Sequence, residues 1–229
     1  SANSPGLIMC SLTPFGQTGP WKDFATTDLI HLSAGGQMGC CGYNEEDVDD
    51  PPPIAGGGGQ AWHMGSHYSF IAILAALNYR AATGKGQYID SSVHDACVLT
   101  TEMHTMTYEY TGEEVRRNTG RHASSVKSFN MPKSQLKCKD GKYINAGIAP
   151  ARLTPERLRV LAEWMDSYGM AGDLLDDKYN DSQFIKDNGP NISSLFVDFV
   201  ANRTQDEVYH GGQQRGFACG AIRTPDDLI

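Results

Sequence analysis

The sequence lacks any apolar run that approaches the roughly 20 residues of a membrane-spanning helix. Positive charge is also scarce, because 19 lysines and arginines against 27 aspartates and glutamates give a formal net charge of −8. Such a chain has no bulk attraction for nucleic acid or for an anionic membrane surface. Its 229 residues, 40% of them hydrophobic, suffice for one substantial core or two smaller ones. We expect a soluble globular chain with no nucleic-acid or membrane partner.

The six cysteines lack the C-x-x-C spacing of zinc and redox motifs. Cys40 and Cys41 could supply a nucleophilic thiolate, but no histidine or basic residue adjoins them, so inert thiols are favoured. Free thiols in the reducing cytoplasm are the simplest interpretation. We therefore expect a cytoplasmic protein.

Candidate metal ligands form no recognised pattern. The acidic run at residues 44–50 lacks the ligand spacing and central glycine of a calcium loop, so a solvated surface loop is expected. His63 and His67 stand four residues apart and would share a helix face. They have no glutamate between them and no third ligand nearby, so they do not make a zinc motif. We predict no metal site.

Glycine and proline divide the first half of the chain into short elements, with loops expected at residues 13–20, 34–36, 51–53 and 56–59. The four glycines at 56–59 either let the backbone approach a phosphate or form a connecting loop, and the loop is favoured. The T-G-K-G-Q run at 83–87 lacks the upstream glycine of a P-loop and ends a helix instead of starting one. An ATPase is therefore excluded.

Residues 73–90 are the most informative stretch. An Ala- and Leu-rich apolar segment is stopped by Gly84 and Gly86, and a β-like segment follows at 88–93. This pattern predicts a buried helix, a tight glycine turn and a strand. The apolar residues at 7–12 predict another buried strand. Strands and helices that alternate in this way indicate an α/β region.

The second half has signals for a hairpin and then for helices. Residues 136–146 predict a hairpin that turns at Asp140 and Gly141. Thr154 precedes a proline and an apolar face that recurs up to Gly169, which predicts a capped, core-facing helix.

Two further helices are predicted, one capped by Ser193 or Ser194 and the other by Thr204. Residues 224–229 begin a capped helix without finishing it, and a strand is expected within a few residues of the first residue. We therefore expect the chain to be part of a longer protein.

Several segments resemble, in order, the motifs of one family. They are SLTPFGQTGP at 11–20, Asp28, SAGG at 33–36, PP at 51–52, the run at 73–90, DA at 95–96, LKCK at 136–139, CG at 219–220 and TP at 224–225. Together they resemble the type III CoA-transferase family, which includes formyl-CoA transferase, carnitine CoA-transferase and α-methylacyl-CoA racemase. The resemblance covers nearly the whole chain.

The resemblance implies a Rossmann-like large α/β domain, a small α+β domain, and two chains that interlock as a dimer. It assigns residues 1–110 to part of the large domain, 111–135 to a linker, and 136–229 to the small domain and the start of the return segment. Other parts of the large domain would lie before Ser1 and after Ile229. A homodimer, or a pair with a homologous subunit, is expected.

The resemblance also implies a transferase that moves CoA from an acyl-CoA to a carboxylic acid, with CoA as substrate or carrier. Family members use an aspartate that becomes acylated and then carries CoA as a thioester. That aspartate aligns with Trp62 or, with the racemase spacing, with Ala61, and neither side chain is a nucleophile. No Asp or Glu occurs between Gly56 and Arg80. The residues that bind CoA are not identified by the sequence.

Three interpretations remain open: a CoA-transferase with an unusual nucleophile, a catalytically silent CoA-binding or partner subunit, and a racemase or isomerase. A racemase needs a histidine immediately before the position of Asp28, where this chain has Thr27. His63 and His67 lie near the missing aspartate and are weak candidates for a base or for a hydrogen bond to a thioester oxygen. Packing on the helix face is the favoured role for both.

Overall fold

The computed structural model describes residues 4–43, 48–120, 126 and 132–229. The first four residues of the predicted acidic loop, 44–47, lie outside the described residues. The chain divides into two compact units. The first contains the described residues up to 119 together with Val126, and the second contains Gly120 and residues 132–229.

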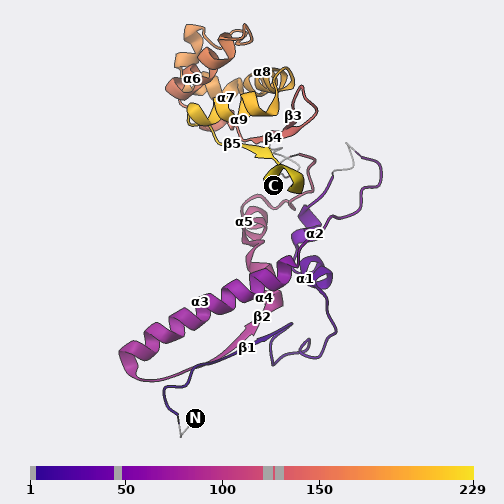
Figure 1. Ribbon diagram of the computed structural model, residues 1–229, viewed down its shortest axis with the longest axis vertical. Coiled ribbons are helices and arrows are strands. Elements are labelled where there is room, and N and C mark those ends of the chain that lie inside the picture. The colour runs from indigo at the N-terminus through magenta and orange to yellow at the C-terminus, as the bar shows by residue number, and fades with distance from the viewer. Residues whose placement is uncertain (1–3, 44–47, 121–125, 127–131) are drawn as a thin grey trace. The chain divides into compact units, whose positions relative to one another are not determined.

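The first unit is built on a two-stranded parallel sheet in which Met9 lies opposite Tyr88 and Thr13 opposite Ser92. Its elements are β1 (Met9–Thr13), α1 (Asp28–Ala34), α2 (Gln37–Cys40), α3 (Gln60–Thr83), β2 (Tyr88–Ser92), α4 (Val93–Leu99) and α5 (Glu102–Thr111). Figure 1 shows α3 running alongside the two strands that it connects. Parallel strands joined through a helix form a βαβ unit, so the predicted α/β character is confirmed.

The predicted helix, glycine turn and strand are confirmed, and the helix begins well upstream, at Gln60. Gly84 ends α3 at φ 73°, and its N–H donates to the carbonyl oxygen of Arg80 at 2.8 Å. A Cβ added at Gly86 would overlap the carbonyl oxygen of Leu7. The turn therefore requires glycine twice, once for a left-handed backbone and once for close approach to the segment before β1.

In the described residues taken by themselves, β1 and α3 are less buried than predicted. Met9 is 55% exposed and Leu12 41%, while Phe70 and Ile71 of α3 are 58% and 59% exposed. The strand has β2 as its sheet neighbour on one side, and α3 packs through a narrow face of small residues. Those buried residues are Ala61, Gly65, Ser69 and Ala76. The sequence contains enough apolar side chains for burial, but the neighbouring elements cover only one side of the helix.

The second unit combines a three-stranded antiparallel sheet, in the order β3-β4-β5, with helices packed against it (Figure 1). Its elements are β3 (Gln135–Lys137), β4 (Tyr143–Ala146), α6 (Pro155–Asp166), α7 (Ser182–Asp187), α8 (Gly189–Ala201), α9 (Gln205–Gln214), β5 (Cys219–Ile222), and the short 3-10 helices η1 (Pro150–Arg152), η2 (Asp177–Asn180) and η3 (Pro225–Leu228). Its core includes the fully buried Ile144, Leu161, Met165 and Phe199. This unit has the α+β arrangement expected of the small domain.

Three local predictions in this unit are confirmed. The hairpin of β3 and β4 turns through Gly141, at φ 80°. Thr154 caps α6, since its hydroxyl accepts from the N–H of Arg157 at 3.3 Å. Thr204 and Glu207 form a capping box at the start of α9, which satisfies two backbone donors of the first turn.

The predicted start of α8 at Ser193 or Ser194 is wrong, because the helix begins one turn earlier, at Gly189. Asn188 stands at its N-cap and Pro190 lies in its first turn, where the missing N–H costs nothing. The segment after β5 forms the short helix η3.

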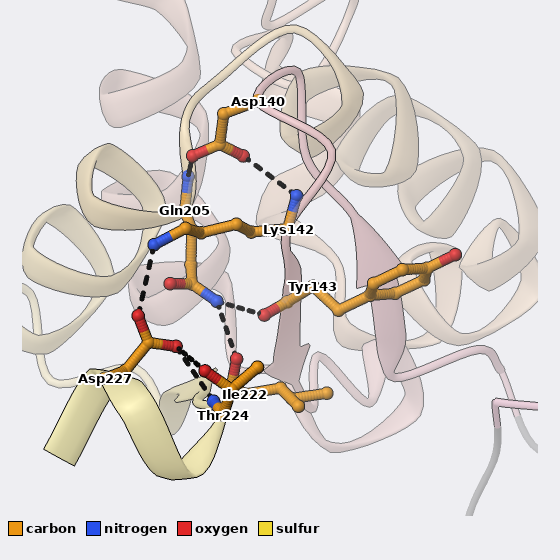
Figure 2. Close-up of polar contacts among 7 residues, drawn as sticks. All are labelled: Asp140, Lys142, Tyr143, Gln205, Ile222, Thr224 and Asp227. Carbon is orange, nitrogen blue, oxygen red and sulfur yellow. Dashed lines mark hydrogen bonds and ion pairs between the residues drawn. The ribbon is translucent and has the colours of Figure 1, made fainter.

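Gln205 joins α9 to the sheet through a side chain that is 2% exposed. Figure 2 shows its amide nitrogen, Nε2, donating to the carbonyl oxygens of Tyr143 at 2.5 Å and of Ile222 at 3.1 Å. Its backbone N–H donates to the carboxylate of Asp140 at 3.1 Å. One side chain therefore holds β4 and β5 to the first turn of a helix.

Candidate active site

The two positions aligned with the family's aspartate lie in the first turn of α3. Gly59, at φ 70°, is the N-cap, so the chain enters the helix through a left-handed residue. Ala61 is completely buried, whereas Trp62 is 42% exposed. The first N–H groups of a helix carry partial positive charge and favour an anion. The backbone of this turn therefore suits a carboxylate that its own side chains do not provide.

A carboxylate reaches the same turn from α1. Asp28 is the first residue of α1, and its Oδ1 accepts a hydrogen bond from the N–H of Ala61 at 2.8 Å. Its other oxygen, Oδ2, accepts no hydrogen bond from any residue that the structure describes. Thr27 caps α1 through its hydroxyl, which accepts from the N–H of Ile30 at 3.4 Å. Asp28 is half-buried, and it links the starts of two helices.

His31, one turn after Asp28, is completely buried against the same part of α3. Its ring centroid lies 5.4 Å from that of Trp62, in an edge-to-face arrangement, and 5.0 Å from that of Phe15. Neither ring nitrogen has a hydrogen-bond partner among the described residues. Burial lowers the pKa of His31, and the nearby His94 lowers it further, while Asp28 acts in the opposite direction. The imidazole is therefore neutral near pH 7.

The segment at residues 11–20, which carries the first family motif, packs beside His31. Asp90, in β2, accepts hydrogen bonds from the backbone N–H of Gln17 with both carboxylate oxygens, at 3.2 and 3.0 Å. This anchor holds the loop that carries Phe15, whose ring also meets Trp21 edge-to-face at 6.0 Å. The aromatic loop and His31 thus pack together next to the first turn of α3.

The weak candidates His63 and His67 are both exposed on α3. Nδ1 of His67 lies 2.7 Å from the carbonyl oxygen of His63, four residues earlier, so this nitrogen carries the proton and donates. The hydrogen bond occupies one nitrogen of His67 within its own helix. A catalytic role for either residue stays a prediction.

The described residues contain neither a cluster of metal ligands nor a membrane-spanning helix. Among the described residues, no group of three or more His, Cys, Asp and Glu side chains could hold a metal ion. In the same part of the chain, no helix is both long enough and apolar enough to cross a bilayer.

Sequence reasoning singled out Asp28 as a motif residue but did not place it in the first turn of α3. The hydrogen bond to Ala61 spans 33 residues, and no local pattern predicts a contact of that range. His31 was missed because a lone histidine among apolar residues gives no motif.

The fold and this site define a mixed α/β chain in which a βαβ unit with a helix-start carboxylate is joined to a small α+β unit. A CAIB/BAIF family protein from Brucella suis has the same fold, with a TM-score of 0.69 and 25% identity over 99% of this chain and 55% of that chain. A hypothetical protein from Mycobacterium tuberculosis, 18% identical, shares the fold with a TM-score of 0.70. The profile of CoA-transferase family III matches residues 1–229, so the chain belongs to CoA-transferase family III.

Two relatives illustrate the family. Succinyl-CoA:(R)-benzylsuccinate CoA-transferase subunit BbsE from Thauera aromatica is 26% identical over 100% of this chain and 53% of its own length. The succinyl-CoA–L-malate CoA-transferase beta subunit from Chloroflexus aurantiacus is 26% identical over 97% of this chain and 49% of its own length. The chain spans about half the length of these relatives. The family predicted from the motifs is confirmed.

Proposed function

We propose that the protein containing this chain transfers CoA from an acyl-CoA to a carboxylic acid. Its membership of CoA-transferase family III over residues 1–229 carries the proposal. The names of the relatives add a substrate class: succinyl-CoA as donor, and benzylsuccinate, malate or citramalate as acceptor. These acceptors are all dicarboxylic acids, so a dicarboxylic acid is the acceptor class we infer.

The reaction exchanges one thioester for another. The donor thioester loses its C–S bond, the acceptor carboxylate gains one, and the donor leaves as a free carboxylate. CoA is both substrate and carrier, and no net proton is taken up or released. Exchange between a thioester and a carboxylate proceeds through acyl intermediates of the anhydride type, for which a carboxylate on the protein is a suitable nucleophile.

We further infer that the active form pairs with a second, homologous chain. Several relatives are named as subunits, among them an alpha and a beta subunit, and the apolar face of α3 is exposed in the isolated chain. The division into a large-domain part at 1–110, a linker at 111–135 and a small domain at 136–229 belongs to the same proposal. Six free cysteines support a cytoplasmic location.

The other interpretations have less support. The interpretation as a silent partner subunit depends on Ala61 and Trp62, which have no carboxylate. Asp28, however, brings a carboxylate to the same helix turn. A racemase would require a base at Thr27, but its hydroxyl is a helix cap.

The test is a transfer assay on the full-length protein, with any subunit that copurifies. Succinyl-CoA is mixed in turn with L-malate, (R)-benzylsuccinate and D-citramalate, and acyl-CoA products are separated by chromatography and identified by mass. At least one acid should yield its CoA thioester and an equal amount of succinate. Reactions without acid, or without protein, control for hydrolysis. Absence of a new thioester with all three acids would reject this donor and acceptor class.

A further inference from the structure

The first turn of α3 has the backbone of a carboxylate site but no carboxylate of its own. We propose that Asp28, carried by α1, is the nucleophile of the transfer reaction. This assignment rests on the proposed function, because it assumes that the protein exchanges a thioester for a carboxylate.

The geometry gives the two oxygens of Asp28 different roles. Oδ1 is fixed by the N–H of Ala61 at 2.8 Å, within the positively polarised first turn of a 24-residue helix. Oδ2 has no hydrogen-bond donor among the described residues. A carboxylate held by one oxygen keeps the other oriented and free of a competing hydrogen bond from the described residues, as a nucleophile requires.

The same hydrogen bond serves the second half of the exchange. Oδ2 attacks the carbonyl carbon of the acyl-CoA, the new C–O bond replaces the C–S bond, and CoA leaves as a thiolate with the electron pair. The thiolate then attacks Cγ of Asp28, forms a C–S bond and expels the donor acid as a carboxylate. Negative charge develops on Oδ1 during this attack, and Oδ1 is the atom that faces the N–H of Ala61. The acceptor carboxylate reverses both steps and restores the aspartate.

His31 is a second polar side chain beside this turn with unused hydrogen-bonding capacity. Buried polar groups nearly always have a hydrogen-bond partner, yet neither nitrogen of this completely buried ring has one among the described residues. The ring lies one helical turn from Asp28 and packs on Trp62. A ligand or water oxygen beside this ring would supply the missing hydrogen bond.

The competing role of Asp28 is structural, as a cap that holds α3 to α1. Asp28→Asn separates the two roles, because the amide oxygen still accepts from Ala61 but the side chain is no longer a nucleophile. Asp23→Asn is the matched control, since this aspartate precedes α1 and its side chain is 86% exposed.

The experiment uses the full-length protein and succinyl-CoA. Wild-type protein is incubated with succinyl-CoA alone, quenched and digested, and the peptide that carries CoA is identified by mass spectrometry. We expect CoA on Asp28, none in Asp28→Asn, and turnover lowered on the order of 1,000-fold or more in that variant, with the melting temperature nearly unchanged. Asp23→Asn should match the wild type in every measurement.

Three results would overturn the assignment. Turnover retained by Asp28→Asn, or CoA found on another residue of the wild-type protein, would reject Asp28 as the nucleophile and leave the proposed function standing. Wild-type protein that exchanges no thioester with any acid would reject both.

Discussion

Replacing Gln205 with leucine should destabilise the second unit through the loss of two hydrogen bonds. The buried amide donates to the carbonyl oxygens of Tyr143 and Ile222, on neighbouring strands (Figure 2). Leucine has a similar volume but no donor, so it leaves both carbonyl oxygens without this partner. The backbone hydrogen bond from residue 205 to Asp140 survives the substitution.

The expected cost follows from the number of hydrogen bonds. Each neutral hydrogen bond contributes about 0.5–1.5 kcal/mol, so two give a loss of about 2 kcal/mol in the free energy of unfolding. Since 1.4 kcal/mol corresponds to a factor of ten, amide protection in the unit should fall by about 30-fold.

Hydrogen exchange read by mass spectrometry is the appropriate assay, because a chain of two units need not unfold in a single transition. Peptides from β4, β5 and α9 report on the second unit, and peptides from α3 and β2 serve as an internal reference. Gln183→Leu is the control, since among the described residues the side-chain amide of Gln183 bonds only the exposed Asp187, at 2.9 Å. Equal protection in the two variants would show that the amide of Gln205 does not join the sheet to α9.

Three further predictions test other features. The free energy of unfolding should fall as pH drops below about 6.5, because His31 is protonated more readily in the unfolded chain than in the folded chain. In urea unfolding at several pH values, His31→Gln should flatten this dependence. An equal pH dependence in the variant and the wild type would contradict the lowered pKa of His31. Gly86→Ala should be among the most damaging single substitutions in the first unit, since its Cβ would overlap the carbonyl oxygen of Leu7. A melting temperature within a degree or two of the wild type would count against that contact. Thr204→Ala should cost about 1 kcal/mol by removing the cap of α9, and an unchanged free energy of unfolding would mean that water replaces the hydroxyl.

Local signals made much of the fold predictable from the sequence. Gly84 and Gly86 marked the end of α3, and Thr154 and Thr204 marked the starts of α6 and α9, because caps and left-handed turns depend on a few adjacent residues. The start of α8 was misplaced because serines were preferred as caps, while Asn188 stood one turn earlier.

Burial and the candidate site were less predictable, for a common reason. Apolar composition does not tell which side of α3 is covered, so the exposure of Phe70 could not be foreseen. The contact of Asp28 with Ala61 likewise depends on how α1 packs on α3, across 33 residues of chain. Family motifs pointed to the first turn of α3, but they directed attention to the residues within that turn and not to Asp28, which contacts it from α1.

The parallel pairing of β1 with β2 also has a consequence for synthesis of the chain. Met9 pairs opposite Tyr88, about 80 residues later, so at roughly 5–20 residues per second the first strand waits about 4–16 s for its neighbour to be made. The hairpin of β3 and β4, in contrast, has both strands available almost at once. Until β2 is made, the edge of β1 that faces it lacks this partner, and for those seconds the edge can pair with a chaperone or with another growing chain.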